Sequence, residues 1–184
     1  LKVSHKMAVN FNKMLKETRG FIPSLRKWRQ ENQKLLFELL QDKESKEFKY
    51  LHDLGLIEES KESIQAFLDE SRVGFYMGNI TLPYIFKGQI INLTRFNFDK
   101  TPKYINTAGT TNGILGVTRK FSSKKDYILL TAGEKDMLLA TKNGFNAATI
   151  LGGEASKPFY FKEIFKNKKV YIAYDNDKAG REGA

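Results

Sequence analysis

The stretch VYIAYDNDKAGREGA, residues 170–184, joins an apolar run to two aspartates and decides how the second half of the chain is expected to fold. Residues 170–174 are apolar or aromatic, which is typical of a buried strand. Asp175 and Asp177 follow at once, and residues two apart in an extended chain point to the same side. The segment therefore predicts a strand that presents two carboxylates together at its carboxyl end.

Two further apolar runs lie upstream and alternate with helical patterns. YILLTA (127–132) and AATIL (147–151) are typical of short strands, whereas EKDMLLATKNG (134–144) and KPFYFKEIFK (157–166) have helical spacing. This alternation predicts parallel βαβ units with right-handed crossovers. Because helices cover both faces of such a sheet, its strands are expected to be buried.

The rest of the chain carries helical signals first and strand signals later. Apolar spacing predicts helices over 4–20, 23–41, 46–54 and 58–70. After residue 72, segments rich in β-branched and aromatic residues predict strands, and Pro83 indicates an edge strand or a strand start. We therefore expect an α/β protein with three parts: a helical region over 1–72, a basic strand-rich subdomain over 73–125, and a parallel sheet with flanking helices over 126–184.

Composition limits the class of protein. The 184 residues include 31 Lys and Arg against 21 Asp and Glu, a net charge of +10 that favours a polyanionic partner such as nucleic acid. The chain has no cysteine, which excludes disulfides and a zinc ribbon and fits the reducing cytoplasm. No run is long enough to span a membrane. A start without Met and an end inside a motif suggest a piece of a longer protein.

Basic residues gather in the middle of the chain. Between Pro83 and Lys125 there are eight basic residues and one acidic residue, Asp99. Aromatic residues interleave with them, so these strands could follow a nucleic-acid backbone and stack bases; alternatively, the aromatics are core and the lysines are solvated. The basic residues are Lys87, Arg95, Lys100, Lys103, Arg119, Lys120, Lys124 and Lys125, and the aromatics are Tyr84, Phe86, Phe96, Phe98, Tyr104 and Phe121.

Three strand-to-helix junctions are expected at one edge of the parallel sheet, where ligands bind in open α/β sheets. The junctions carry Glu134 with Asp136, then Gly152 with Gly153, then the aspartate pair that follows residue 174. Carboxylates without nearby His or Cys suit Mg²⁺ or Mn²⁺, and the glycine pair permits close approach of a phosphate. Two other interpretations of DNDKAG are a calcium loop, which lacks its closing Glu, and a plain surface turn.

The combined motifs resemble a known family. TAGEKDMLLATKNGFNAATILGGE (131–154), followed by the 170–184 stretch, resembles the TOPRIM fold of bacterial-type primases, topoisomerases and some nucleases, and DNDKAGREGA is closest to the primase and phage primase-helicase form. Residues 50–67, 80–96 and TPKYINT (101–107) resemble the helical and basic subdomain that precedes TOPRIM in DnaG-type primases. The resemblance covers about 46–184.

This resemblance implies roles for individual residues. Asp175 and Asp177 match the family's metal-binding pair, and Asp136 matches the acid of its first motif. Arg95 and Lys103 match basic residues that contact the template or the incoming nucleotide. The family carries a Glu directly before the first-motif glycine, where this chain has Ala132. Either Glu134 has taken over as a metal ligand, or the site is impaired.

The resemblance implies a DNA primase core, a nucleotidyltransferase that makes RNA primers on single-stranded DNA from nucleoside triphosphates with Mg²⁺ or Mn²⁺. Asp175, Asp177 and Glu134 are the expected ion ligands. The implied partner is a replicative helicase, in trans or on the same polypeptide. A TOPRIM nuclease and a non-catalytic nucleic-acid-binding module of a replication protein remain alternatives, and the TOPRIM sheet is expected to be incomplete at its C-terminal end.

Overall fold

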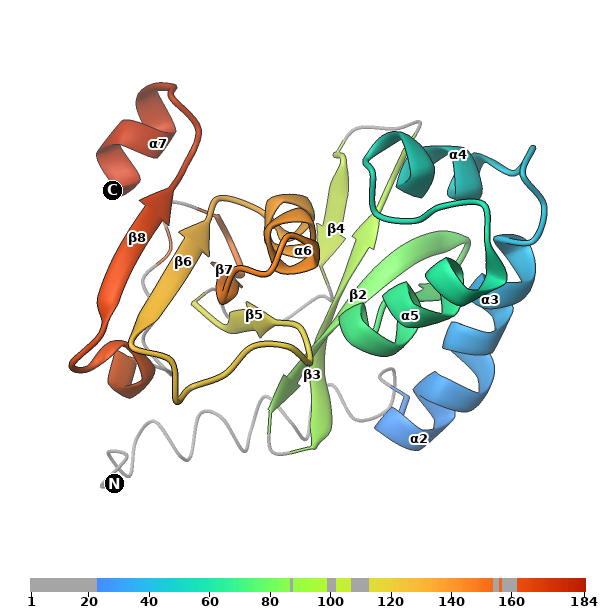
Figure 1. Ribbon diagram of the computed structural model, residues 1–184, viewed down its shortest axis with the longest axis horizontal. Helices are drawn as coiled ribbons and strands as arrows, with labels where there is room; N and C mark the ends of the chain where they lie inside the picture. The colour runs from blue at the N-terminus through green and yellow to red at the C-terminus, as the bar shows by residue number, and fades with distance from the viewer. Residues whose placement is uncertain (1–22, 87, 99–101, 107–112, 154–155, 157–161) are drawn as a thin grey trace.

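The computed structural model describes residues 23–86, 88–98, 102–106, 113–153, 156 and 162–184. The helix predicted over 4–20 lies outside these residues, as do Lys87, Asp99 and Lys100 of the predicted basic surface. The described part divides into a helical and antiparallel half and a half built on a mostly parallel sheet (Figure 1). It is a mixed α/β structure, as the sequence predicts.

The first helical path runs over 25–39, close to the range predicted from the sequence. It comprises α2 (Leu25–Lys27), a π-helical stretch η1 (Trp28–Gln33) and α3 (Lys34–Leu39). Ser24 caps its start, because its hydroxyl accepts a hydrogen bond from the Lys27 N–H at 3.2 Å. Trp28 and Leu36 are completely buried on the inner side of this path.

Two more helices follow at the predicted places, α4 (Lys46–Asp53) and α5 (Lys61–Ser71). Both begin at a serine whose hydroxyl accepts a backbone hydrogen bond at 3.1 Å, Ser45 from Phe48 and Ser60 from Ser63. These caps satisfy N–H groups that have no partner inside the helix.

The first sheet is antiparallel, with strands β1 (Gly74–Tyr76), β2 (Asn79–Phe86), β3 (Gln89–Phe96) and β4 (Tyr104–Asn106) in sequence order. β1 pairs with β2 only over Asn79–Thr81, so Pro83 lies where β2 has one paired neighbour in this sheet. The edge strand or strand start expected at Pro83 is wrong, because β2 lies between β1 and β3 and Pro83 is in its middle. The proline is tolerated there because the pairing with β1 ends before it, so no second ladder needs its missing N–H.

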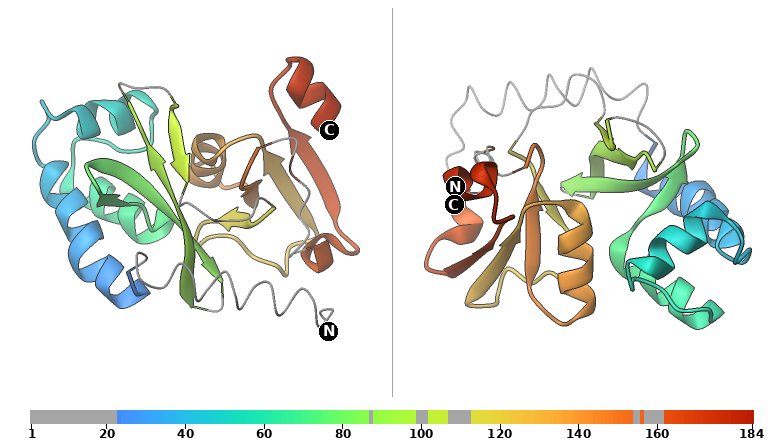
Figure 2. Two further views of the ribbon diagram at one scale, coloured as in Figure 1. Left: turned by 180° about the vertical axis from the view of Figure 1, so that it is seen from behind. Right: turned by 90° about the horizontal axis from the view of Figure 1, so that it is seen from above.

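The second sheet has the order β5-β7-β6-β8, with strands β5 (Leu115–Val117), β6 (Tyr127–Thr131), β7 (Ala147–Ile150) and β8 (Lys169–Ala173). β6 pairs in parallel with both β7 and β8, which confirms the parallel units, and β5 is antiparallel to β7. β5 lies within the stretch 73–125 but joins this second sheet. Helix α6 (Glu134–Lys142) lies on the side that faces the first sheet (Figure 2).

One sequence prediction about the second sheet is wrong, and a second is met only in part. The strands of this sheet are expected from the sequence to be buried, but β8 is an outer strand and every one of its residues is exposed. Tyr171, for example, is 54% exposed. Of the helix predicted over 157–166, residues 157–161 lie outside the described residues, and the remainder forms a 3-10 helix, η2 (Lys162–Phe165), in place of an α-helix. An apolar run indicates a strand, but only its neighbours decide whether that strand is buried.

One buried core joins the two halves of the molecule. It includes Leu36 and Leu51 from the helices, Leu82 from β2, and Met137 and Leu138 from α6. A smaller cluster lies on the other side of the second sheet. The shared core fixes the position of α6, and therefore of its first turn, relative to the first sheet.

Candidate active site

The carboxyl ends of β6, β7 and β8 lie side by side. Thr131 of β6 is paired with Thr149 of β7 and with Ala173 of β8. The turns that follow these strands therefore begin at one edge of the sheet, which is where ligands bind in open α/β sheets. We call this edge the acidic rim, defined by Glu134, Asp136, Asp175 and Asp177.

Glu134 and Asp136 stand on the first turn of α6 in different surroundings. Gly133 is the N-cap residue, and Glu134, the first helical residue, is 9% exposed. Its Oε1 accepts a hydrogen bond of 2.8 Å from the hydroxyl of Tyr84 on β2. Asp136 is exposed to solvent. Only Asp136 of this pair therefore has a freely accessible carboxylate.

Asp175 and Asp177 lie in the turn between β8 and α7 (Lys178–Gly183), and both are exposed. Oδ1 of Asp177 accepts a hydrogen bond of 2.8 Å from the Gly180 N–H and so caps α7. A side chain at Gly180 would overlap the carbonyl group of Asp175, so the turn and the helix can approach only at a glycine. One oxygen of Asp177 is thus occupied locally, whereas Asp175 has no such capping role.

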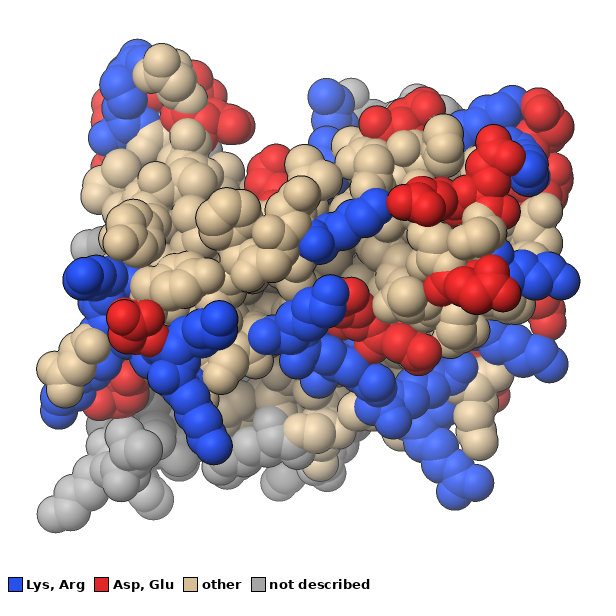
Figure 3. Space-filling model, viewed as in Figure 1, with Lys and Arg blue, Asp and Glu red and all other residues tan. Residues whose placement is uncertain are grey.

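Tyr104 on β4 brings the first sheet to the acidic rim. Burial raises its pKa most, and the nearby charges of Glu134, Asp136 and Asp175 raise it further. Carboxylates from two separate junctions therefore lie within electrostatic reach of one tyrosine. Figure 3 shows this face hollowed between α7 and the body beside β4, with acidic atoms at the base of the hollow and basic atoms on its rim.

Lys103 lies just before β4, and Arg95 lies on β3, the strand that pairs with β4. Lys103 directly precedes Tyr104 and is exposed, and Arg95 is paired with Ile105 of β4. Since side chains alternate along a strand, Arg95 leaves the sheet on the face opposite to Tyr104, where its guanidinium contacts the Met77 sulfur at 3.6 Å. Lys103 is thus a neighbour of Tyr104 along the chain, while Arg95 points to the other face of the sheet.

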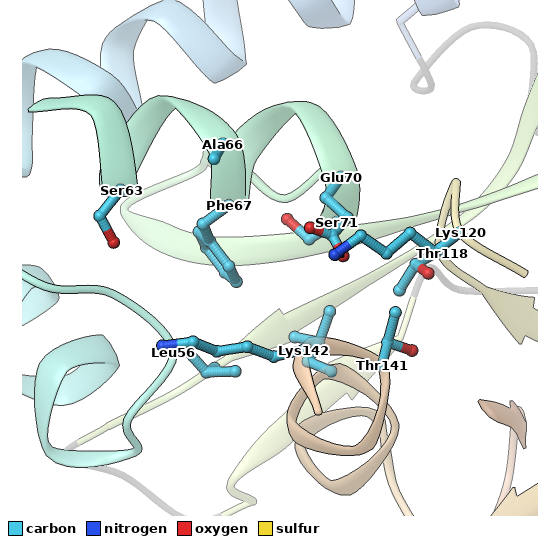
Figure 4. Close-up of a pocket in the computed structure, with 11 residues that line it drawn as sticks. Leu56, Ser63, Ala66, Phe67, Glu70, Ser71, Thr118, Lys120, Thr141 and Lys142 are labelled. Atoms are coloured by element: carbon cyan, nitrogen blue, oxygen red, sulfur yellow. The ribbon is translucent and has the colours of Figure 1, made fainter. Parts of the chain in front are cut away.

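Arg119 and Lys120 are placed with α5, away from the first turn of α6. The Arg119 N–H donates to the Glu70 carbonyl at 2.9 Å, and the Lys120 ammonium pairs with the Glu70 carboxylate. Lys120 lines a cavity of about 210 Å³ between α5 and the far end of α6 (Figure 4). That cavity contacts Thr141 and Lys142, about 8 Å along the helix from Asp136.

Gly152 and Gly153 follow β7 with the backbone angles that glycine favours. Their φ values are 98° and 72°, and the space beside Gly153 is open. A backbone of this kind at the acidic rim can approach a bulky anion closely.

The base-stacking role expected of the aromatic residues is wrong for two of them. Tyr84 is 1% exposed and Phe96 is 2% exposed, and both belong to the shared core. Phe86, Phe98 and Tyr104 are partly buried against the same core. A side chain without accessible surface cannot stack on a base, so the core alternative holds for Tyr84 and Phe96.

Some of the carboxylate oxygens at the acidic rim are accessible as ligands for a hard cation such as Mg²⁺. Among the residues that the structure describes, no three His, Asp or Glu side chains form a ready-made ion site. Magnesium, however, usually takes only one or two protein carboxylates and completes its shell with water and phosphate oxygens. Asp136 and Asp175 offer such exposed oxygens, and Glu134 differs because it is buried and hydrogen-bonded.

Two tyrosines that matter at this site were not singled out as site residues. The Glu134 charge and burial raise the pKa of Tyr50 on α4 to about 12, burial being the larger cause, so Tyr50 also lies near the acidic rim. Tyr84 contacts Glu134 from 50 positions away in the sequence. No local pattern signals either contact, since both arise from packing between distant elements.

Comparison with known proteins gives structural resemblances alone. No family model matches the chain, and no curated protein matches it. The structure is similar to the crystal structure of the Aquifex aeolicus primase, zinc-binding and RNA polymerase domains, with 21% identity and a TM-score of 0.47. The match covers 99% of this chain, which spans about half (51%) of that one. Similarity at this level does not by itself assign an activity. No helix in the described ranges combines the length and apolar character needed to cross a membrane.

Proposed function

We propose that this chain is the core of a DNA primase, which joins ribonucleotides on a single-stranded DNA template. One observation carries the proposal: Asp136 and Asp175, which follow the adjacent parallel strands β6 and β8, lie within electrostatic reach of Tyr104, which Lys103 directly precedes in the chain. Acidic groups that can hold a divalent ion thus lie near the segment that carries Lys103, a residue type that can bind phosphates. The motifs at these positions are those that resemble TOPRIM primases.

The residues would divide the work by charge. Asp136, Asp175 and Asp177 would hold Mg²⁺ or Mn²⁺, with Glu134 predicted from the sequence as a further ligand. Bound ions of this kind neutralise charge on the attacking and leaving oxygens of a phosphoryl transfer. Lys103 and Arg95 would bind template or triphosphate oxygens, and Gly152 and Gly153 leave room for a phosphate. Positioning and charge neutralisation supply most of the rate in this chemistry.

The proposal is tested by primer synthesis on single-stranded DNA with Mg²⁺ and labelled nucleoside triphosphates. We expect short oligoribonucleotides from the wild-type chain, and a loss of at least about a hundredfold in Asp175→Asn, because an ion ligand contributes several kcal/mol to the transition state. Asp69→Asn, which changes an exposed aspartate on α5, should retain activity. Shortening of the template in place of synthesis would instead identify a nuclease.

A non-catalytic nucleic-acid-binding module is the second candidate. It is favoured by Ala132, which cannot bind an ion, together with the burial of Glu134 against Tyr84. Salt-dependent binding of single-stranded DNA without synthesis or cleavage, unchanged in Asp175→Asn, would support this function over the first. The helicase partner implied by the sequence resemblance stays a prediction under either function.

A further inference from the structure

Tyr84 lies at the contact between the two sheets. It belongs to β2 of the first sheet and is 1% exposed. Its ring rests directly on β5 of the second sheet: a Cβ built at Gly116 would lie 2.8 Å from Cε1 of the ring and 2.9 Å from the Thr149 methyl group. Since real Cβ atoms do not approach so closely, the ring occupies space that exists only because residue 116 is glycine.

The hydroxyl of Tyr84 contacts Glu134, one of the residues of the acidic rim. It donates the 2.8 Å hydrogen bond to Oε1 of Glu134, within the buried interior. Burial and the adjacent Glu134 charge raise the pKa of Tyr84 well above its ordinary value, so the hydroxyl keeps its proton. A buried carboxylate needs such a donor, because an unpaired one is costly.

Glu134 stands at the start of α6. It is the first residue of the helix, and Asp136 stands two residues later on the same turn. A displacement of Glu134 therefore moves Asp136 relative to Asp175, which is held separately by β8 and its turn.

We propose that Glu134 is an anchor and not an ion ligand, and that Tyr84 is a positioning residue: their hydrogen bond fixes the start of α6 and holds Asp136 opposite Asp175. This inference rests on the proposed function, because it assumes that these aspartates hold an ion. Glu134 is given a different role from the exposed aspartates because it is buried and its carboxylate already accepts a hydrogen bond from Tyr84.

Two conservative substitutions separate an anchor from a ligand. Tyr84→Phe keeps the ring against Gly116 but removes the donor, whereas Glu134→Gln removes the charge but keeps an oxygen that accepts from Tyr84. Titration of the 184-residue chain with Mn²⁺ should show about a tenfold weaker affinity in Tyr84→Phe and a smaller loss in Glu134→Gln. A loss in Glu134→Gln that equals or exceeds that of Tyr84→Phe overturns the proposal. Tyr171→Phe, at an exposed tyrosine on β8, is the matched control and should bind as wild type does.

Two further measurements separate failure of the anchor from failure of the proposed function. Asp175→Asn should abolish Mn²⁺ binding. If this variant binds Mn²⁺ with wild-type affinity, the proposed function is contradicted, and there is no ion site at Asp175 for Tyr84 and Glu134 to position. The anchor itself is tested by urea unfolding of Tyr84→Phe, Glu134→Ala and the double variant. In the wild-type background, Tyr84→Phe should lower the ratio of folded to unfolded protein about tenfold. In the Glu134→Ala background, the same substitution should lower this ratio less than about twofold. Independent effects in the two backgrounds would show that no anchor exists.

Discussion

At the scale of single residues, Gly116 and Tyr84 show how one missing side chain permits a contact between sheets. Gly116 lets the Tyr84 ring lie against β5, and the hydroxyl of the same side chain contacts Glu134 of α6. Glycine in a strand often marks such a close approach of a neighbouring group. The sequence ILGVTRKF shows the glycine within a strand but not which side chain lies against it.

Gly116→Ala is expected to destabilise the chain by about 2 kcal/mol or more, because the new methyl group must displace a rigid ring and the Thr149 methyl in a packed interior. Urea unfolding measures the change. Gly133→Ala serves as the control: its Cβ would meet Asp136 at an ordinary 3.5 Å, and the expected cost is below about 1 kcal/mol. Equal stability of the wild type and Gly116→Ala would show that the ring does not rest on β5.

At the scale of elements, Trp28 is one of the residues that join the first helical path to β1. Trp28 is fully buried, its indole N–H donates to the Arg72 carbonyl at 2.9 Å, and its ring packs against Gly74. The leucine and tryptophan spacing predicts this helix and its buried side. The π-helical turn at Trp28–Gln33 has no comparable signal in the sequence.

Trp28→Ala is expected to cost about 3–5 kcal/mol in the free energy of unfolding, because it leaves a cavity between helix and sheet and an unpaired carbonyl. Denaturant unfolding followed by circular dichroism gives the value. Leu35→Ala on the same path, at a side chain 43% exposed, should cost less than about 1 kcal/mol. Similar costs for the two variants would contradict the packing described.

At the scale of the whole molecule, a net charge of +10 favours a polyanionic partner, and the proposed function makes single-stranded DNA the one to test. Affinity should fall linearly with salt on logarithmic axes, and Lys103→Ala and Arg95→Ala should each reduce the slope by about 0.7 if each side chain contacts one phosphate. Lys34→Ala, at an exposed lysine on α3, is the control and should leave the slope unchanged. Fluorescence anisotropy at several salt concentrations measures the slopes, and equal slopes for all variants would exclude β3 and β4 from the interface.

The sequence by itself determined the local structure and the order of the chain. Apolar periodicity identified the described helices and the three parallel strands, and the position of Asp175 and Asp177 after β8 followed from their place in the chain. These features depend on neighbours within a few residues, which a sequence displays directly.

Only the tertiary structure decided which of these groups meet. It placed Tyr84 in the core and Glu134 against it, left β8 exposed, and turned Arg95 to the face opposite Tyr104. Alternation along a strand says which residues share a face, but not which face another layer will cover. Coverage depends on elements distant in the chain that pack into one core, and that packing is a property of the whole fold.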